Sequence, residues 1–285
     1  MRPWCLFVLR VAGTFRVTSA FGTLSGRLRA LVDLAEQPWV LGDDSGELPR
    51  GLVADVGCDH GYIAAELAQR GRSVVACDVA AEPLQRAREH FAAISAPAPA
   101  AFLLGDGVRA VMAESNLPWC ETAVIAGVGG RTAARLLDEA HTLECSADDA
   151  QRPPRRVVLQ PTQQFLAHMV DLRMALQRHN YHVVGERWLD DQKGSGRVNF
   201  RRFLVTIVAE KAAEEAQLSD VELLIGRRVE DPARLAYVTH HARWLAKIVA
   251  SAEASQEPSF LRGVQKEAKW RDLLQEELRC LETPR

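Results

Sequence analysis

The sequence lacks the cysteine spacing of a metal site or a disulfide framework. Its 6 cysteines are scattered singly, and no two of them form a C-x-x-C pair. Closely spaced pairs are typical of zinc sites, and dense cysteines are typical of small secreted domains. Isolated cysteines are instead typical of buried apolar positions in a reducing compartment. We therefore expect a cytoplasmic protein with no metal site.

Long apolar runs and an excess of one charge are missing as well. No apolar run approaches the roughly 20 residues of a membrane span, so no membrane partner is expected. The formal net charge is −2, so any nucleic acid must be bound by a local basic patch. Hydrophobic residues still make up 47% of the 285 residues, enough for a packed core in one large domain or two smaller ones. We favour a monomer.

Acidic residues are absent from residues 1–23, which contain Arg2, Arg10 and Arg16. Arg10 interrupts the apolar core that a secretory signal needs, so we do not expect secretion. An organellar presequence and an upstream start codon both remain open as explanations. We favour a disordered N-terminal extension over residues 1–23 and begin the fold at residue 24.

The most informative stretch is residues 52–62, where an apolar run ends in Asp55 and is followed by Gly57 and Gly61. A helical pattern begins directly after it, so the stretch predicts a strand, a glycine turn and a helix. Glycines let the backbone approach a ligand and leave the amides of the helix free to bind it. The turn reads D-x-G-x-D-x-G, whose spacing differs from the G-x-G-x-x-G of nicotinamide enzymes.

The D-x-G-x-D-x-G turn resembles the first motif of Rossmann-like methyltransferases that use S-adenosyl-L-methionine. By itself this stretch fits an ordinary strand-to-helix turn of an α/β protein equally well. A second acid strengthens the ligand-binding interpretation, because Asp78 ends the next apolar strand, 23 residues after Asp55. Rossmann-type folds place the acid that binds ribose hydroxyls at about this separation.

Strand and helix patterns alternate through the first two thirds of the chain. A short helix is expected over 24–35, and strands over 73–79, 101–104, 122–126 and 156–160, with helices over 61–71, 82–94, 130–140 and 163–179. Residues 181–189 and 203–208 alternate like a closing antiparallel pair. The pattern predicts a doubly wound, mostly parallel sheet, which binds ligands at the carboxyl ends of its strands.

The last part of the chain has no strand pattern and almost no glycine. Asp231 and Pro232 are a typical helix start, and apolar residues recur at helical spacing over 235–249 and 260–281. Two helices joined by residues 251–259 predict an antiparallel hairpin. The adjacent His240 and His241 point to different faces and are interpreted as structural. The expected divisions are therefore 1–23, 24–210 and 211–285.

Several ordered motifs together resemble the bacterial tRNA (adenine(22)-N1)-methyltransferase family. They are Leu24-Ser25-x-Arg27-Leu28, the turn from Ala54 to Tyr62, Gly105-Asp106-Gly107, Ile125-Ala126-Gly-x-Gly129-Gly130, Leu159-Gln160-Pro161, Leu172-Arg173, Glu186 and residues 218–226. The resemblance implies a Rossmann-like class I methyltransferase domain followed by a helical coiled-coil hairpin. It also implies S-adenosyl-L-methionine as cofactor, tRNA as partner and methylation at N1 of an adenine.

The chain departs from that family's pattern at three places. Val128 stands where methionine is usual, Thr162 where asparagine is usual, and Arg201-Arg202-Phe203 near a usual lysine and tyrosine. Val128 changes packing only mildly. Thr162 removes an amide that could touch the base, which puts the substrate geometry there in doubt.

The resemblance also assigns roles to residues. Cofactor binding falls to the strand-end acids and glycines Asp55, Gly57, Gly61, Asp78, Asp106, Gly107 and Gly127, with Asp78 facing the ribose and Asp106 the adenine amine. Asp59 and His60 are the candidate catalytic residues, positioning the base or accepting a proton. The alternative for Asp59 is a helix cap, and for His60 a hydrogen bond to the backbone.

Local positive charge is the candidate RNA surface. The residues are Arg27, Lys193, Arg197, Arg201 and Arg202, with further arginines at 152, 155 and 156. The plainer interpretation of such runs is a solvated charged loop. Two other functions stay open: a methyltransferase of the same fold acting on another RNA or a small molecule, and a non-catalytic RNA-binding relative that does not bind the cofactor.

Overall fold

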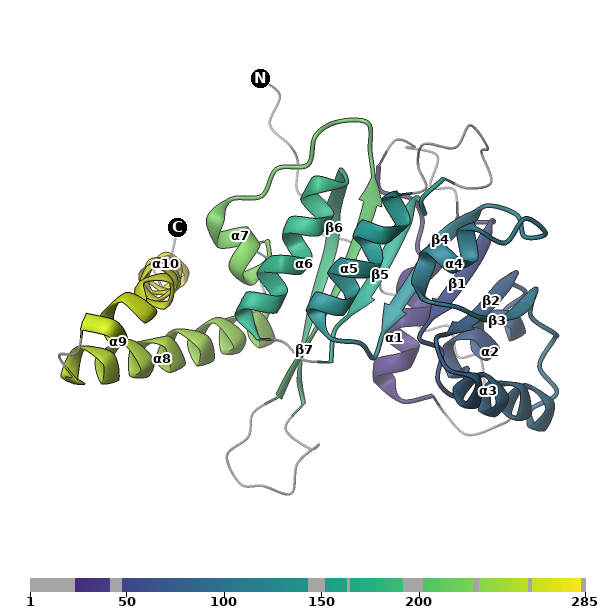
Figure 1. Ribbon diagram of the computed structural model, residues 1–285, viewed down its shortest axis with the longest axis horizontal. Helices are drawn as coiled ribbons and strands as arrows, with labels where there is room; N and C mark the ends of the chain where they lie inside the picture. Colours follow the sequence, from purple (N-terminus) through teal and green to yellow (C-terminus); the bar gives the residue numbers. More distant parts are fainter. Residues whose placement is uncertain are drawn as a thin grey trace.

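The computed structural model describes residues 24–41, 48–142, 152–162, 165–191, 202–227, 231–255 and 258–282. A seven-stranded sheet in the order β3-β2-β1-β4-β5-β7-β6 forms its centre (Figure 1). The strands are β1 (Leu52–Val56), β2 (Val74–Asp78), β3 (Ala101–Leu104), β4 (Cys120–Ala126), β5 (Arg156–Gln160), β6 (Tyr181–Asp191) and β7 (Arg202–Lys211).

The first five strands are parallel, whereas β7 is antiparallel to both β5 and β6. The chain order reverses at β1, which lies between β2 and β4. In a doubly wound sheet this is the point at which ligands bind, just outside the carboxyl ends of the strands. The predicted fold class, a doubly wound and mostly parallel sheet, is therefore confirmed.

Helices cover both faces of the sheet, and the central strands between them are mainly apolar and buried along their whole length. Every residue of β1, β2 and β5 is buried. One apolar core lies under α1 (Gly26–Ala35), α2 (Tyr62–Gln69) and α3 (Ala81–Ala93). The opposite core lies under α4 (Gly107–Met112), α5 (Gly130–His141) and α6 (Leu166–Arg178). Such continuous burial is typical of parallel sheets between two helical layers.

Helix α4 was not expected from the sequence. It has only six residues and directly follows a glycine turn, so it offers too little periodicity to recognise. Val108, Val111 and Met112 nevertheless recur at helical spacing and are buried against the sheet. The other elements of the sheet domain lie within a few residues of their predicted positions.

The C-terminal segment is helical, as predicted. Helix α7 (Asp220–Ile225) starts with a capping box between Ser219 and Glu222, and α8 (Pro232–Ser255) and α10 (Gln265–Glu282) pack against each other. These two long helices extend away from the sheet beyond β6 (Figure 1). The expected loop over 251–259 is partly wrong, because α8 continues to Ser255 and a short helix α9 (Pro258–Gly263) follows.

Two buried ion pairs lie where the C-terminal helices meet the sheet. Arg173 of α6 binds Glu186 of β6 at 2.8 Å and the carbonyl oxygens of Leu223 and Leu224, both at 3.2 Å. Arg234 of α8 binds Glu277 of α10 at 3.1 Å. Removing one partner of such a pair would leave an uncompensated buried charge, so the pairs fix how these elements join.

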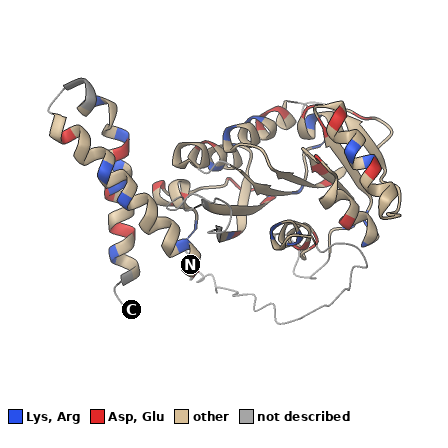
Figure 2. Cartoon of the chain, turned by 90° about the horizontal axis from the view of Figure 1, so that it is seen from below, with Lys and Arg blue, Asp and Glu red and all other residues tan. Residues whose placement is uncertain are grey.

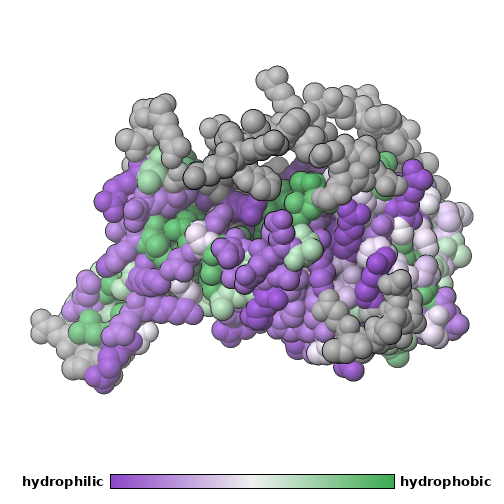
Figure 3. All heavy atoms as spheres, turned by 90° about the horizontal axis from the view of Figure 1, so that it is seen from above, coloured by the Kyte–Doolittle hydropathy of each residue, from purple (hydrophilic) through white to green (hydrophobic). Residues whose placement is uncertain are grey.

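Charged, polar and apolar side chains are interspersed on the surface of the described residues. Acidic and basic residues are mixed along the helices (Figure 2), and hydrophilic residues cover most of the face seen from above (Figure 3). No helix among the described residues is both long enough and apolar enough to cross a membrane.

Candidate functional site

The loops that follow β1, β2 and β3 are tied together at the carboxyl edge of the sheet. The carbonyl oxygen of Cys77 accepts hydrogen bonds from the backbone N–H groups of Gly57 and Cys58, at 2.9 and 3.0 Å. The carbonyl oxygen of the next residue, Asp78, accepts one from Gly105 at 2.9 Å. The end of β2 therefore fixes both the glycine turn after β1 and the turn after β3.

The glycine turn is held in a conformation that most residues avoid. Gly57 and Gly61 have φ angles of 74° and 66°, and Asp59 between them has a φ of 47°. Aspartate tolerates this region better than most residues other than glycine. At Gly61 a side chain is excluded as well, because an added Cβ would lie 2.8 Å from the Cβ of Ala87 in α3. The turn is therefore packed tightly against α3.

Asp55 supports this turn from inside the protein. It is 2% exposed, and its carboxylate accepts a hydrogen bond from the N–H of Ala64 in the first turn of α2 at 3.0 Å. Burial raises the pKa of Asp55 to about 7, the Ala64 hydrogen bond opposes this rise, and the nearby charge of Asp78 adds to it. A buried acid of this kind orients the turn rather than offering an open surface to a ligand.

Asp78 lies at the end of β2 and is 9% exposed. One carboxylate oxygen accepts the N–H of Asp59 at 3.2 Å, and the other accepts the N–H of Ala80 at 3.0 Å. Each oxygen of an ionised carboxylate has two lone pairs, so capacity remains for ligand hydroxyl groups. The structure thus brings together three residues that the sequence indicated, Asp55, Asp78 and the turn at Asp59.

The side chain of Asp59 points to α3. Its Oδ1 accepts a hydrogen bond from Arg86 Nη2 at 3.1 Å, and its Oδ2 lies 3.8 Å from His60 Nε2, too far for a hydrogen bond. The capping alternative is wrong, because α2 begins after Gly61 with no side-chain cap. His60 makes no hydrogen bond to the backbone within the described residues, and its ring stacks on Tyr62 at 5.6 Å.

Asp106 lies in the turn after β3, with its side chain 50% exposed. Both of its carboxylate oxygens accept hydrogen bonds from Arg135 of α5, at 2.9 and 3.2 Å. The following residue, Gly107, has a φ of 73°, and a Cβ there would collide with the side chain of Leu136. Arg135 and Arg86 were not predicted as site residues from the sequence. Their only signal is a glutamate four residues away on the same helix.

The turn after β4 completes the edge on the other side of β1. Gly127 has a φ of 80°, and a Cβ added there would meet nothing within 4 Å, so its Cα faces open space. The N–H and the hydroxyl of Thr162 both donate to the carbonyl oxygen of Val128, at 2.9 and 3.3 Å. Two of the residues that depart from the family pattern, Val128 and Thr162, therefore contact each other and link the turns after β4 and β5.

A family model described as a methyltransferase domain matches residues 48–195, which include the strands and turns of this site. The chain belongs to this methyltransferase family. No curated protein sequence matches it significantly.

Solved structures resemble this methyltransferase over nearly its whole length. The Streptococcus pneumoniae protein Sp1610, assigned as a tRNA (m1A22) methyltransferase, has a TM-score of 0.67 and 24% identity, over 90% of this chain and 100% of its own. M. capricolum TrmK in complex with S-adenosyl-homocysteine has a TM-score of 0.67 and 17% identity, over 90% and 99%. An uncharacterized Listeria monocytogenes protein has a TM-score of 0.70 and 17% identity, over 89% and 99%.

Most of the expected RNA-binding residues of this methyltransferase fall outside what the structure describes. Lys193, Arg197 and Arg201 lie outside the described residues, and Arg202 is described only as the first residue of β7. Arg27 lies half-buried on α1. The RNA-binding role of these five residues stays a prediction.

One of the three arginines near the start of β5, Arg156, needs a correction. Arg156 is 1% exposed and forms an ion pair with Glu210 of β7, so it cannot reach a phosphate. Arg155 lies over the ring of Trp39 at 4.0 Å, and Arg152 lies over that of Trp119 at 3.7 Å. All three lie near the amino end of β5, opposite the carboxyl edge. The burial of Arg156 could not be predicted from the sequence, because its partner Glu210 is 54 residues away.

Proposed function

We propose that this methyltransferase uses S-adenosyl-L-methionine to methylate N1 of an adenine in tRNA, in the position-22 class. The observation that supports it is the likeness to the Streptococcus pneumoniae protein named for this reaction, which at 90% coverage of this chain extends beyond the sheet into the C-terminal helices. The Streptococcus pneumoniae protein was also solved with S-adenosyl-L-methionine. A tRNA substrate is consistent with a cytoplasmic location.

The residues at the carboxyl edge fit such a cofactor. Gly127 faces open space and leaves room for close approach, and the Asp78 carboxylate retains acceptor capacity for ribose hydroxyls. Asp106 would accept a hydrogen bond from the amino group of the cofactor's adenine, and Asp55 would hold the turn that contains Gly57 and Gly61. When bound, the cofactor supplies a methyl group made electrophilic by its sulfonium.

The reaction needs positioning rather than a covalent nucleophile from the protein. The lone pair of adenine N1 is itself the nucleophile, and the base must be unpaired or flipped to expose it. The thiols of Cys58 and Cys77, close to the glycine turn, are poor candidates for a nucleophile. Burial raises the pKa of Cys77 to about 12 and raises the pKa of Cys58 as well. Both thiols therefore stay protonated at neutral pH.

Asp59 is the residue we assign to the base. Positive charge spreads over the adenine ring and its amino group as the methyl is transferred, so a carboxylate nearby stabilises the transition state. Oδ1 of Asp59 accepts a hydrogen bond from Arg86. Oδ2, which lies on the side of His60, is left to accept a hydrogen bond from the amino group of the adenine. His60, whose side chain is 44% exposed, lies where it can orient the same base.

Incubation with isotopically labelled S-adenosyl-L-methionine and unmodified total tRNA tests the proposal. After digestion to nucleosides, the label should appear in 1-methyladenosine. Label in another RNA or in a small molecule would favour a different substrate on the same fold. Failure to bind the cofactor in calorimetry would favour a non-catalytic RNA-binding relative.

A further inference from the structure

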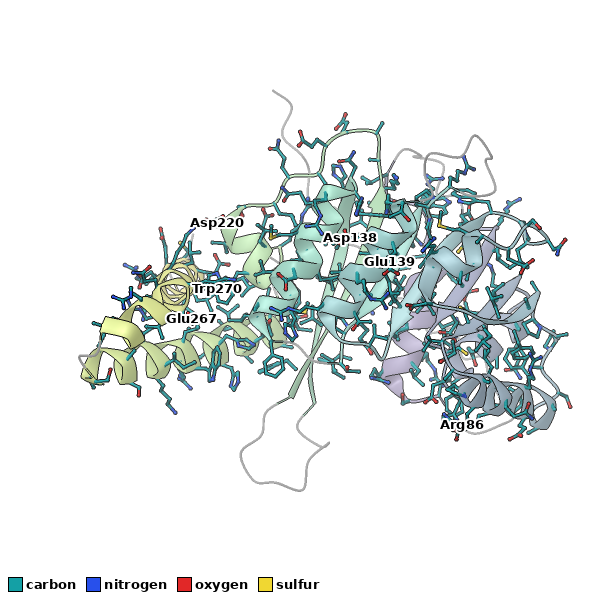
Figure 4. The ribbon with its side chains drawn as sticks, viewed as in Figure 1. Arg86, Asp138, Glu139, Asp220, Glu267 and Trp270 are labelled. Atoms are coloured by element: carbon teal, nitrogen blue, oxygen red, sulfur yellow. The ribbon has the colours of Figure 1, made fainter. Side chains whose placement is uncertain are left out.

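Two arginines on different helices are built into the site edge in the same way. Arg86 lies on α3 and Arg135 on α5, and each binds a glutamate one helical turn away: Glu82 for Arg86 and Glu139 for Arg135. Figure 4 labels one residue of each pair, Arg86 and Glu139, on the two helices. Each arginine also binds the aspartate of a turn at the carboxyl edge. These aspartates are the two site acids whose side chains are substantially exposed, 62% for Asp59 and 50% for Asp106.

The packing that places the first arginine comes from the glycine turn. Gly61 lies so close to Ala87 that a Cβ would not fit, and Arg86 directly precedes Ala87 on α3. Arg86 then donates from Nη1 to Glu82 at 2.7 Å and from Nη2 to Asp59 at 3.1 Å.

The second arginine is placed by the same construction. Gly107 lies against Leu136, where a Cβ would collide, and Arg135 directly precedes Leu136 on α5. Arg135 donates to both oxygens of Asp106 and, from Nη1, to Glu139 at 2.7 Å. We call the contact of Arg86 with Asp59, and that of Arg135 with Asp106, an arginine clamp. Each clamp lies next to a close glycine contact, and the two lie on opposite faces of the sheet.

We propose that Arg86 and Arg135 are positioning residues for two separate parts of the reaction. Arg135 orients Asp106 toward the adenine amino group of the cofactor, and Arg86 orients Asp59 toward the base that is methylated. This proposal rests on the proposed function. An exposed carboxylate without such a clamp samples several rotamers and is fully hydrated, whereas each clamped aspartate keeps lone pairs in a fixed direction.

The clamps predict opposite effects in binding and turnover. Arg135→Gln should weaken S-adenosyl-homocysteine binding about three- to tenfold in calorimetry while turnover at saturating cofactor stays near wild type. Arg86→Gln should leave that binding unchanged and lower turnover about three- to tenfold. Lysine at either position keeps the charge but not the bidentate geometry, so it should restore part of the Arg86 defect and little of the Arg135 defect.

The glutamates provide matched controls. Glu82→Gln and Glu139→Gln remove the negative charge of the second partner of each arginine but leave the contact with the aspartate, so both quantities should stay within about twofold of wild type. A double-mutant cycle of Arg135→Gln with Asp106→Asn adds a test independent of folding, since the two losses should not be additive if they act through one contact.

The outcomes separate this proposal from the proposed function. A wild-type protein that binds no S-adenosyl-homocysteine, or methylates no tRNA, contradicts the proposed function itself. If the wild-type protein does both, variants that lower binding and turnover together, or that change neither, overturn only the proposed positioning roles of Arg86 and Arg135. Circular dichroism melting of each variant identifies unfolding, and in that case the lysine variants decide.

Discussion

Asp55→Asn is the substitution that tests the electrostatics of the site most sharply. The wild-type carboxyl is buried against the N-terminus of α2, and burial raises its pKa from 3.8 to about 7. Between these two pH values the folded protein holds a proton that the unfolded chain has released. Asparagine keeps a carbonyl oxygen for the N–H of Ala64 but has no charge to titrate.

The magnitude follows from linkage between protonation and folding. One pKa unit corresponds to 1.36 kcal/mol, so a rise from 3.8 to about 7 amounts to about 4 kcal/mol. The folded state binds more protons than the unfolded state in this window, so the contribution of Asp55 to stability falls as pH rises from about 4 to about 7 and is constant above that. The variant lacks this fall.

Urea unfolding at intervals between pH 4 and pH 8 measures the effect. The free energy of unfolding of Asp55→Asn minus that of wild type should increase by about 4 kcal/mol across this range, whatever constant offset the amide introduces. Parallel curves for wild type and Asp55→Asn would refute the assignment of a raised pKa to this carboxyl.

Three further substitutions test other parts of the account. Asp78→Ala should weaken cofactor binding by about 1–3 kcal/mol, since it removes the proposed ribose acceptor and the hydrogen bonds to the N–H groups of Asp59 and Ala80; unchanged affinity in calorimetry would remove Asp78 from the site. Asp59→Ala should lower turnover far more than cofactor affinity, and a variant that loses only affinity would make Asp59 a cofactor residue. Gly226→Ala should lower the free energy of unfolding by about 1–3 kcal/mol, because its φ is 78° and a Cβ would collide with Glu186. Gly263→Ala, where a Cβ meets nothing within 4 Å, should not destabilise, and equal melting of the two alanine variants would contradict this explanation.

Local patterns predicted the fold because strands and helices alternate regularly and apolar runs end in acids or glycines. The strand limits at 101–104 and 156–160 agree with β3 and β5. Asp55, Asp78 and the glycine turn could be placed together because parallel strands bring their carboxyl ends to one edge. Here the local sequence and the global topology favour the same arrangement.

Contacts between distant residues could not be predicted in this way. Nothing near Arg156 in sequence indicates Glu210, so an arginine in a buried ion pair was grouped with possible phosphate-binding residues. The clamp of Arg135 on Asp106 joins residues 29 apart, and that of Arg86 on Asp59 joins residues 27 apart. Such pairs depend on how helices pack on turns, which periodicity does not reveal.

The most direct test of the proposed reaction uses two matched tRNA transcripts. One carries adenosine at the D-loop/D-stem border, and the other carries guanosine there and is otherwise identical. Wild-type protein with S-adenosyl-L-methionine should produce 1-methyladenosine in the first transcript, measured by mass spectrometry of nucleosides, and none in the second. Equal methylation of both transcripts, or a methyl group on any other nucleoside, would contradict the proposed function.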